Sequence, residues 1–188
     1  TLSPGVTPRF HWSLPSFTLE SSPVPLHTKT QPPWTTGAAA TKAFRPGAAA
    51  KLGLGPEDLR KDNPRLVYAS ISGFGQSGPW RARPGYDLAV QGISGLQSIT
   101  GPEGGEPTKV GTSIADLISG IYAAQGILLA LYRREKTGRG DVVDVSMLDS
   151  VVSLLTYQAG IYFAGGDVPT RIGNRHPTIA PYETFRAK

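Results

Sequence analysis

The sequence predicts an α/β fold for this chain of 188 residues, on three observations. A short apolar, β-branched run at 66–72 stops at a glycine loop, which is typical of a buried strand. A long apolar segment at 114–136 has the length of a helix, and 142–146 shows a second strand pattern. Strand and helix patterns therefore alternate along the chain, as they do in α/β layers.

Residues 1–43 differ in composition from the rest of the chain, and we expect them to be disordered. The segment is rich in Ser and Thr and shows no apolar periodicity, and its prolines are Pro4, Pro8, Pro15, Pro23, Pro25, Pro32 and Pro33. Such a segment buries too little apolar surface to offset the entropy that ordering costs. Its scarcity of acids resembles an organelle transit peptide, but the prolines oppose the amphipathic helix of such peptides. The alternative is a segment foreign to the ancestral domain, so the chain divides into 1–43 and a domain at 44–188.

The domain is predicted to be a series of strands and helices separated by glycine-rich turns. After the strand at 66–72, residues 86–96 have helical spacing and 101–107 form a Gly- and Pro-rich loop. The segment 114–136 is apolar on nearly all sides, which predicts a buried helix whose last turn carries Arg and Lys into solvent. After the strand at 142–146, residues 147–163 are predicted to form one further helix that closes at Gly165 and Gly166.

The composition favours a water-soluble protein that works without a metal. The chain has no cysteine, which excludes disulfides and Cys-built zinc sites, and only three histidines. Its longest apolar run, 127–132, is much shorter than the ~20 residues of a membrane-spanning helix. The net charge of +5 indicates an acidic partner. Because the basic cluster at 133–139 lacks interleaved aromatic residues, a small polyanion such as a nucleotide is favoured over nucleic acid.

Residues 73–78 match the G-x-G-x-x-G pattern of dinucleotide-binding turns. In such turns a helix begins inside the motif, so that its N-terminus faces the pyrophosphate. Here two prolines and two arginines follow within 79–84, and no ribose-binding acid is evident. A plain glycine loop above a strand end is therefore favoured. The Arg-Gly-Asp tripeptide at 139–141 is interpreted as a turn rather than as a cell-adhesion motif.

Asp116 is the candidate catalytic residue. It lies at the start of the long predicted helix, where the partial positive charge of the helix terminus favours an ionised acid. The local pattern alone favours a helix N-cap, a role that Ser113 could share. The flanking residues are small, which leaves room for a substrate: Gly111, Thr112, Ser113, Ala115, Ser119 and Gly120. An ionised carboxylate at such a position can attack a thioester without a partner base.

From residue 44 to 188 the chain resembles the family III CoA-transferases, the superfamily of formyl-CoA transferase and α-methylacyl-CoA racemase. The blocks that carry the resemblance are 44–47 (FRPG), 51–54 (KLGL), 63–75 (NPRLVYASISGFG), 85–89 (GYDLA), 113–117 (SIADL), 126–131 (GILLAL), 137–140 (TGRG) and 143–149 (VDVSMLD). They follow the family's order. The resemblance implies a partial Rossmann-like domain with buried helices and a short parallel sheet.

The resemblance also implies a mechanism and a set of site residues. Asp116 would attack a donor acyl-CoA and form a mixed anhydride, and the released thiolate would then give an aspartyl-CoA thioester from which a second carboxylic acid takes the CoA. Tyr86 would lie at the reacting end of the site. Phe44 would lie near the adenine, and Arg45 and Lys51 would contact CoA phosphates. CoA enters as a thioester substrate, and no cofactor or metal is implied.

Two alternatives to a transferase stay open. The racemase branch has a histidine where this chain has Tyr86, and a tyrosine of pKa about 10 suits proton transfer near neutral pH poorly, so transfer is preferred. The other alternative is an inactive CoA-binding fragment, because the chain matches neither the family's first half nor its C-terminal part and so corresponds to a family member truncated at both ends. Ala43 also replaces the Asn that precedes the 44–47 block, which puts one CoA contact in doubt.

The resemblance implies acyl-CoA and a small carboxylic acid as partners, without nucleic acid or membrane, and a homodimer for full-length members. The sequence does not specify the donor or the acceptor acid. We expect a cytoplasmic location, with mitochondria as the alternative. His176 matches a family block at 173–177, and a structural role for it is favoured over a catalytic one.

Overall fold

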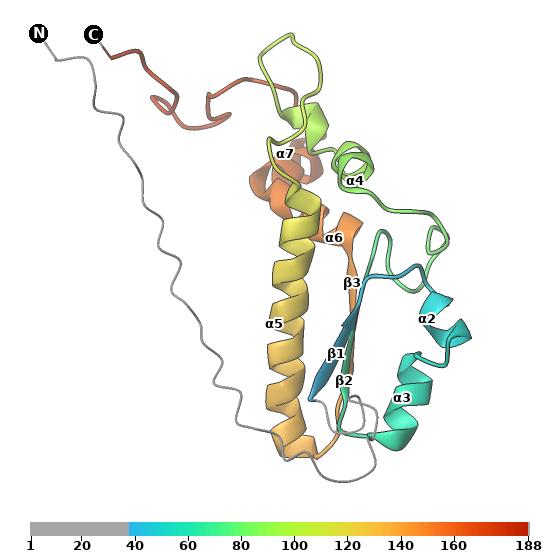
Figure 1. The fold of residues 1–188 in the computed structure, drawn as a ribbon. Coiled ribbons are helices and arrows are strands. Elements are labelled where there is room, and N and C mark those ends of the chain that lie inside the picture. The colour runs from blue at the N-terminus through green and yellow to red at the C-terminus, as the bar shows by residue number, and fades with distance from the viewer. Residues whose placement is uncertain (1–37, 188) are drawn as a thin grey trace, which may run out of the picture. The chain divides into compact units, whose positions relative to one another are not determined.

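The structure is a computed structural model that describes residues 38–187. A parallel sheet of three strands lies at its centre, in the order β1 (Ala39–Lys42), β2 (Val67–Ser72) and β3 (Val142–Ser146) (Figure 1). Ala39 pairs with Val67, and Tyr68 pairs with Val142. The prediction of an α/β fold with a short parallel sheet is confirmed.

Strand β1 corrects the predicted domain boundary. It begins at Ala39, whereas the domain was expected to begin at residue 44 and the residues before it were expected to be disordered. All four of its residues are paired with β2, from Ala39 with Val67 to Lys42 with Ser70. The pattern AATK carries a single β-branched residue, so strand formation here depends on the neighbouring strand rather than on local propensity. The rest of the predicted disordered segment, 1–37, lies outside the described residues.

Two short helices that the sequence analysis did not predict lie on one side of the sheet. They are α2 (Ala48–Lys51) and α3 (Pro56–Asp62), and Figure 1 shows them across the sheet from the long helix α5. Leu59 of α3 packs with Leu66 and Tyr68 in a small buried cluster. The Tyr68 hydroxyl donates a hydrogen bond of 2.8 Å to the carbonyl oxygen of Leu54, which fixes the turn between the two helices.

The other side of the sheet is covered by α5 (Ile114–Thr137), at the place where the sequence predicts a helix. Its small residues Ala115, Ser119, Ala123 and Ala130 are buried. At Gly126 a β-carbon would lie only 2.6 Å from Cγ1 of Val143, so this glycine lets the helix lie close against β3. The face of α5 turned toward the sheet is therefore built from small side chains.

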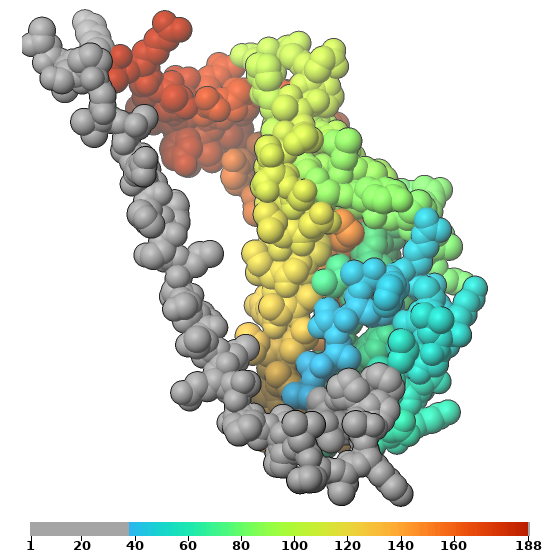
Figure 2. All heavy atoms as spheres, viewed as in Figure 1, coloured from blue at the N-terminus to red at the C-terminus, as the bar shows by residue number. Residues whose placement is uncertain are grey.

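The large apolar residues of α5 lie on its outward face, contrary to the prediction of a helix buried on nearly all sides. Leu117, Ile121, Leu128, Leu129 and Tyr132 are each more than half exposed. Figure 2 shows α5, in yellow, forming part of the visible surface. The helix is also long and apolar enough to cross a membrane by length and composition alone, a test that core helices of soluble proteins pass as well. Packing of the described residues covers only its small-residue face.

The remaining helices gather at the carboxyl end of the strands. They are α4 (Asp87–Ile93), the 3₁₀ turn η1 (Gln97–Ile99), α6 (Met147–Val152), the 3₁₀ turn η2 (Ser153–Leu155) and α7 (Thr156–Gly165). Val90, Ala115, Met147 and Val151 join α4, α5 and α6 in one buried cluster.

The single helix predicted over 147–163 is instead broken into α6, η2 and α7. Ser150 and Ser153 donate side-chain hydrogen bonds of 2.7 Å to backbone carbonyls four and three residues earlier, respectively, and such bonds compete with regular helix geometry. Thr156 then takes a φ of 42°, which is strained for a β-branched residue. The apolar periodicity that predicted one helix does not report this local change of direction.

We predict that Tyr68→Phe lowers the free energy of unfolding of the chain by about 1 kcal/mol at pH 7, because the hydrogen bond to Leu54 is lost. Burial, and secondarily the charge of Asp58, raises the pKa of Tyr68 above its ordinary value of 10.0. A raised folded pKa stabilises the fold below pH 10 and loses that stabilisation as the pH rises through the folded value. The difference between variant and parent should therefore shrink above pH 10.

Denaturant titrations between pH 7 and pH 11 measure this difference directly. Burial lowers the pKa of Lys42, and the charge of Asp144 offsets only part of this shift. Lys42 is present in both proteins, so its contribution to the pH dependence of stability cancels when the two are compared. A stability difference that stays constant across this range would contradict the prediction.

Candidate active site

A cavity of about 430 Å³ opens at the carboxyl end of the sheet, where α/β proteins commonly hold their ligands. Its walls come from the segments that follow β1 and β2, from the loop before α4, and from the starts of α5 and α6. The lining residues are Ala43, Phe44, Arg45, Pro46, Ile71, Ser72, Gly73, Arg83, Pro84, Gly85, Tyr86, Asp116, Ser119 and Met147. Phe44, Arg45, Tyr86 and Asp116, four of the five predicted site residues, thus meet at one cavity.

Asp116 is in the first turn of α5, three residues after Ser113, which occupies the N-cap position. It is exposed, and no other group among residues 38–187 forms a hydrogen bond or ion pair with its carboxylate. The partial positive charge of the helix N-terminus stabilises an anion at this place. The interpretation of Asp116 as a helix cap is wrong for this structure, and its carboxylate is free at the cavity wall.

The first turn of α5 is capped instead by Asp87, the first residue of α4. Its Oδ1 accepts a hydrogen bond of 2.8 Å from the backbone N–H of Ala115, and its Oδ2 accepts one of 2.8 Å from Nε2 of Gln91. Oε1 of the fully buried Gln91 in turn accepts a bond of 2.9 Å from the N–H of Val110. No local sequence pattern indicates this network, although Asp87 directly follows Tyr86 in the 85–89 block.

Tyr86 reaches the cavity because two backbone segments touch. A β-carbon at Gly85 would lie 2.3 Å from Cα of Gly73, so both positions require glycine and the segment before α4 lies directly on the end of β2. Tyr86 follows as the N-cap residue of α4, and the residue is 68% exposed. The glycine loop at 73–78 is followed by turns rather than by a helix, so the interpretation as a plain glycine loop agrees with the structure.

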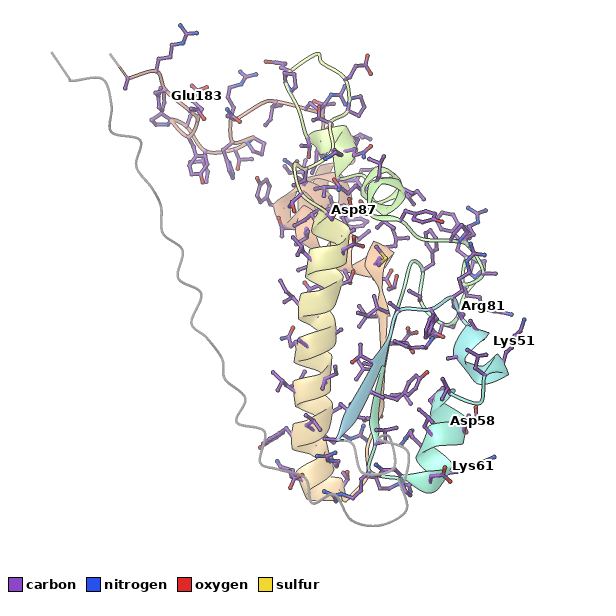
Figure 3. All side chains as sticks on the ribbon, in the orientation of Figure 1. Lys51, Asp58, Lys61, Arg81, Asp87 and Glu183 are labelled. Carbon is purple, nitrogen blue, oxygen red and sulfur yellow. The ribbon has the colours of Figure 1, made fainter. Side chains whose placement is uncertain are left out.

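Phe44 and Arg45 line the cavity directly after β1. Phe44 is half exposed, and no group in the described part of the chain pairs with the guanidinium of Arg45. Lys51, the fifth predicted site residue, is the last residue of α2 and is not part of the cavity wall. Figure 3 shows its side chain pointing outward from α2. Lys51 would therefore meet a ligand only where the ligand extends beyond the cavity.

Arg83 is a cavity residue that the sequence analysis did not single out. Its guanidinium carbon lies 4.6 Å from the centroid of the Trp80 ring, and Trp80 in turn packs edge-on against Phe74 at 5.4 Å. Stacking of this kind holds an arginine without neutralising its charge. The cavity thus has two basic side chains, Arg45 and Arg83, and the carboxylate of Asp116.

His176 lies outside the cavity wall. Its Nδ1 accepts hydrogen bonds from the backbone N–H groups of Thr178 and Ile179, at 3.2 and 3.1 Å, and its ring packs against Tyr157 and Tyr182. These contacts support the structural role expected for it. Within residues 38–187, no group of three or more His, Asp and Glu side chains is placed to hold a metal ion.

Comparison with known proteins gives a consistent match. Residues 39–188 match the model of CoA-transferase family III. Over 146 residues the chain is 49% identical to an acetyl-CoA:oxalate CoA-transferase of Acetobacter aceti. This alignment covers 77% of this chain and 38% of the relative. It is 41% identical over 145 residues to the human succinyl-CoA:glutarate CoA-transferase, covering 77% of this chain and 33% of the relative.

Among solved structures, a CAIB/BAIF family protein from Brucella suis aligns with a TM-score of 0.77 at 40% identity. The alignment covers 81% of this chain and 40% of that protein. The chain therefore spans well under half the length of the relatives that it matches.

The contact between Gly73 and Gly85 predicts that Gly85→Ala destabilises the chain by about 1–3 kcal/mol, the usual cost of forcing an extra methyl group into a closed contact. Gly111→Ala is the matched control, because a β-carbon there meets no atom within 4 Å. Denaturant unfolding of the two variants measures the difference. Equal stabilities of Gly85→Ala and Gly111→Ala would show that there is room for a β-carbon at residue 85, against the distance of 2.3 Å to Cα of Gly73.

Proposed function

Because the chain belongs to CoA-transferase family III, we propose that it moves coenzyme A from an acyl-CoA donor to a carboxylic acid, with Asp116 as the nucleophile. The observation that carries the proposal is the position of Asp116. Its carboxylate lies at a helix N-terminus, without a hydrogen-bond partner among the described residues, at the same cavity as Phe44, Arg45 and Tyr86. A helix terminus that is capped by another residue leaves this carboxylate available for reaction.

The chemistry balances without a general base. One oxygen of the Asp116 carboxylate attacks the thioester carbonyl, the C–S bond breaks, and a mixed anhydride and the CoA thiolate result. The thiolate attacks the aspartyl carbonyl of the anhydride and releases the donor acid as a carboxylate, which leaves an aspartyl-CoA thioester. The acceptor carboxylate then attacks the aspartyl carbonyl of this thioester, the C–S bond breaks, and a second anhydride and the CoA thiolate result. The thiolate attacks the acceptor carbonyl of this anhydride, breaks its bond to the aspartyl oxygen and gives the new acyl-CoA. Asp116 is returned as a carboxylate, and no proton is transferred in any step.

The cavity walls suggest how CoA is bound. Arg45 offers a planar set of donors for a phosphate group, and the neighbouring Phe44 offers a half-exposed ring against which the adenine can pack. Lys51 lies farther along, on α2, where it would meet a more distant phosphate. Tyr86 approaches the reacting carbonyl from the α4 side. CoA is a substrate in this scheme, and no resident cofactor takes part.

The acceptor that we propose is a small dicarboxylic acid. Relatives of this chain are named for transfer to oxalate, glutarate and mesaconate, all of which carry two carboxylates. Arg83 gives the cavity wall a second basic side chain in addition to Arg45. We also propose a homodimer for the whole protein, in the cytoplasm or the mitochondria, without nucleic-acid or membrane partners.

We predict that Asp116→Ala lowers the rate of CoA transfer by at least about a thousandfold, as loss of a covalent nucleophile does in other enzymes. Hydroxylamine added to the parent chain with acyl-CoA should convert Asp116 to its hydroxamate, which mass spectrometry locates. Asp167→Asn, which changes an exposed carboxylate outside the cavity wall, is the control and should keep the parent rate. Transfer that survives Asp116→Ala would disprove the mechanism.

A reaction in deuterated water separates transfer from racemisation. Transfer leaves the α-hydrogen of an α-methylacyl-CoA in place, so we predict no deuterium at this carbon after many turnovers. Racemisation removes this hydrogen and replaces it with deuterium from the solvent. Deuterium incorporation measured by mass spectrometry would favour the racemase, and CoA binding without turnover would favour an inactive fragment.

A further inference from the structure

We propose that Asp87 is a positioning residue for the reaction: it caps α5 across the tertiary structure and so sets the direction in which Asp116 faces the cavity. The inference rests on the proposed function, in which Asp116 is the nucleophile. Asp87 itself is not part of the cavity wall, and both of its carboxylate oxygens accept hydrogen bonds. It therefore acts through the backbone of α5 and does not touch the reacting atoms.

The first turn of a helix has N–H groups without partners in the helix, and a side chain at the N-cap usually accepts from one of them. In α5 the N-cap residue Ser113 makes no such bond. The missing acceptor is supplied by Asp87, 28 residues earlier, to the N–H of Ala115. Because Ala115 is fully buried, water does not reach this N–H while Asp87 is in place, and Asp87 is its acceptor. The start of α5 therefore depends on a residue of another helix.

A second bond holds the chain just before the helix begins. Gln91 lies one turn after Asp87 on α4. Its Oε1 accepts a hydrogen bond from the N–H of Val110, and its Nε2 donates one to Oδ2 of Asp87. The segment from Val110 to Ala115 is thus held at both ends by two side chains of one helix that also bond to each other. Figure 3 shows Asp87 beside the first turn of α5. Such a closed network restricts the backbone more than either bond would alone.

Asp116 follows Ala115 directly, so the bond to the N–H of Ala115 holds the first turn of α5, whose backbone sets the direction of the Cα–Cβ bond of Asp116. No partner among the described residues orients its carboxylate, which leaves the backbone as the source of its alignment. An error of about 1 Å in the placement of a reacting group costs about a hundredfold in rate. Loss of the cap should therefore act on catalysis and leave CoA binding intact, because Phe44 and Arg45 belong to the segment after β1.

The test compares Asp87→Ala with Asp87→Asn, which keeps an oxygen acceptor for the N–H of Ala115. We expect Asp87→Ala to lower kcat by about 10- to 100-fold with the KM for acyl-CoA changed less than about twofold. The kcat of Asp87→Asn should be at least about tenfold higher than that of Asp87→Ala, since asparagine restores an acceptor for the N–H of Ala115 without the charge. Rates are expressed per molecule that binds CoA, so that unfolded protein does not count.

Asp58→Ala is the matched control, because Asp58 also accepts from a backbone N–H at a helix start, that of Gly55 at 3.2 Å, but on α3. It should lower stability and leave kcat unchanged. An unchanged kcat in Asp87→Ala would overturn the proposal. An equal loss in Asp87→Asn and Asp87→Ala would overturn the role given to the bond with Ala115, because asparagine keeps an acceptor for this N–H and loses only the acceptor for Nε2 of Gln91.

Hydrogen exchange gives a readout that does not depend on transfer. In Asp87→Ala the backbone amides of Val110 and Ala115 should exchange about tenfold faster than in the parent chain, while those at the C-terminal end of α5 stay unchanged. Unchanged exchange at Ala115 would refute the cap even if Asp116 is the nucleophile. Faster exchange together with full transfer by Asp116→Ala would refute the proposed function and leave the cap of α5 in place.

Discussion

The close packing of α5 against the sheet is the constraint on which the rest of the structure depends. Small side chains and Gly126 bring the helix axis near β2 and β3, and larger side chains on this face would push it away. Because α5 runs opposite to the strands, this contact brings its first turn to the carboxyl end of the sheet. The cavity lies there, so the packing of the whole helix determines where Asp116 is found.

The cavity also needs the segment before α4 to lie directly on β2. Backbone touches backbone at Gly73 and Gly85, and this contact places Tyr86 opposite the start of α5. The same segment continues into Asp87, which bonds to Ala115. One short stretch of chain therefore supplies a cavity residue and, one position later, the residue that holds the neighbouring helix in place. Tyr86 therefore lines the cavity, while the adjacent Asp87 holds the first turn of α5.

Sequence patterns predicted the elements whose own periodicity is strong and failed where a neighbour decides the structure. The strands at 66–72 and 142–146 and the helices at 86–96 and 114–136 were found because burial imposes a regular spacing on them. Strand β1 was missed because its pairing with β2 forms it, and Thr156 broke a helix that periodicity made continuous. The prediction of a buried helix at 114–136 is correct for one face of α5, where its small residues are buried. Its outward leucines show that apolar character alone does not identify which face packs.

The same limit applies to the site, where two aspartates meet at one helix terminus and local patterns cannot tell their roles apart. Asp116 has the sequence position of a cap, yet the cap comes from Asp87, which is distant in sequence. Hydrogen bonds to both oxygens stabilise the charge of Asp87, and a carboxylate stabilised in this way is a weak nucleophile. Asp116 has the favourable potential of the helix terminus without donors of this kind among the described residues. Under the proposed mechanism, the hydrogen-bond environment thus assigns support to one carboxylate and reaction to the other.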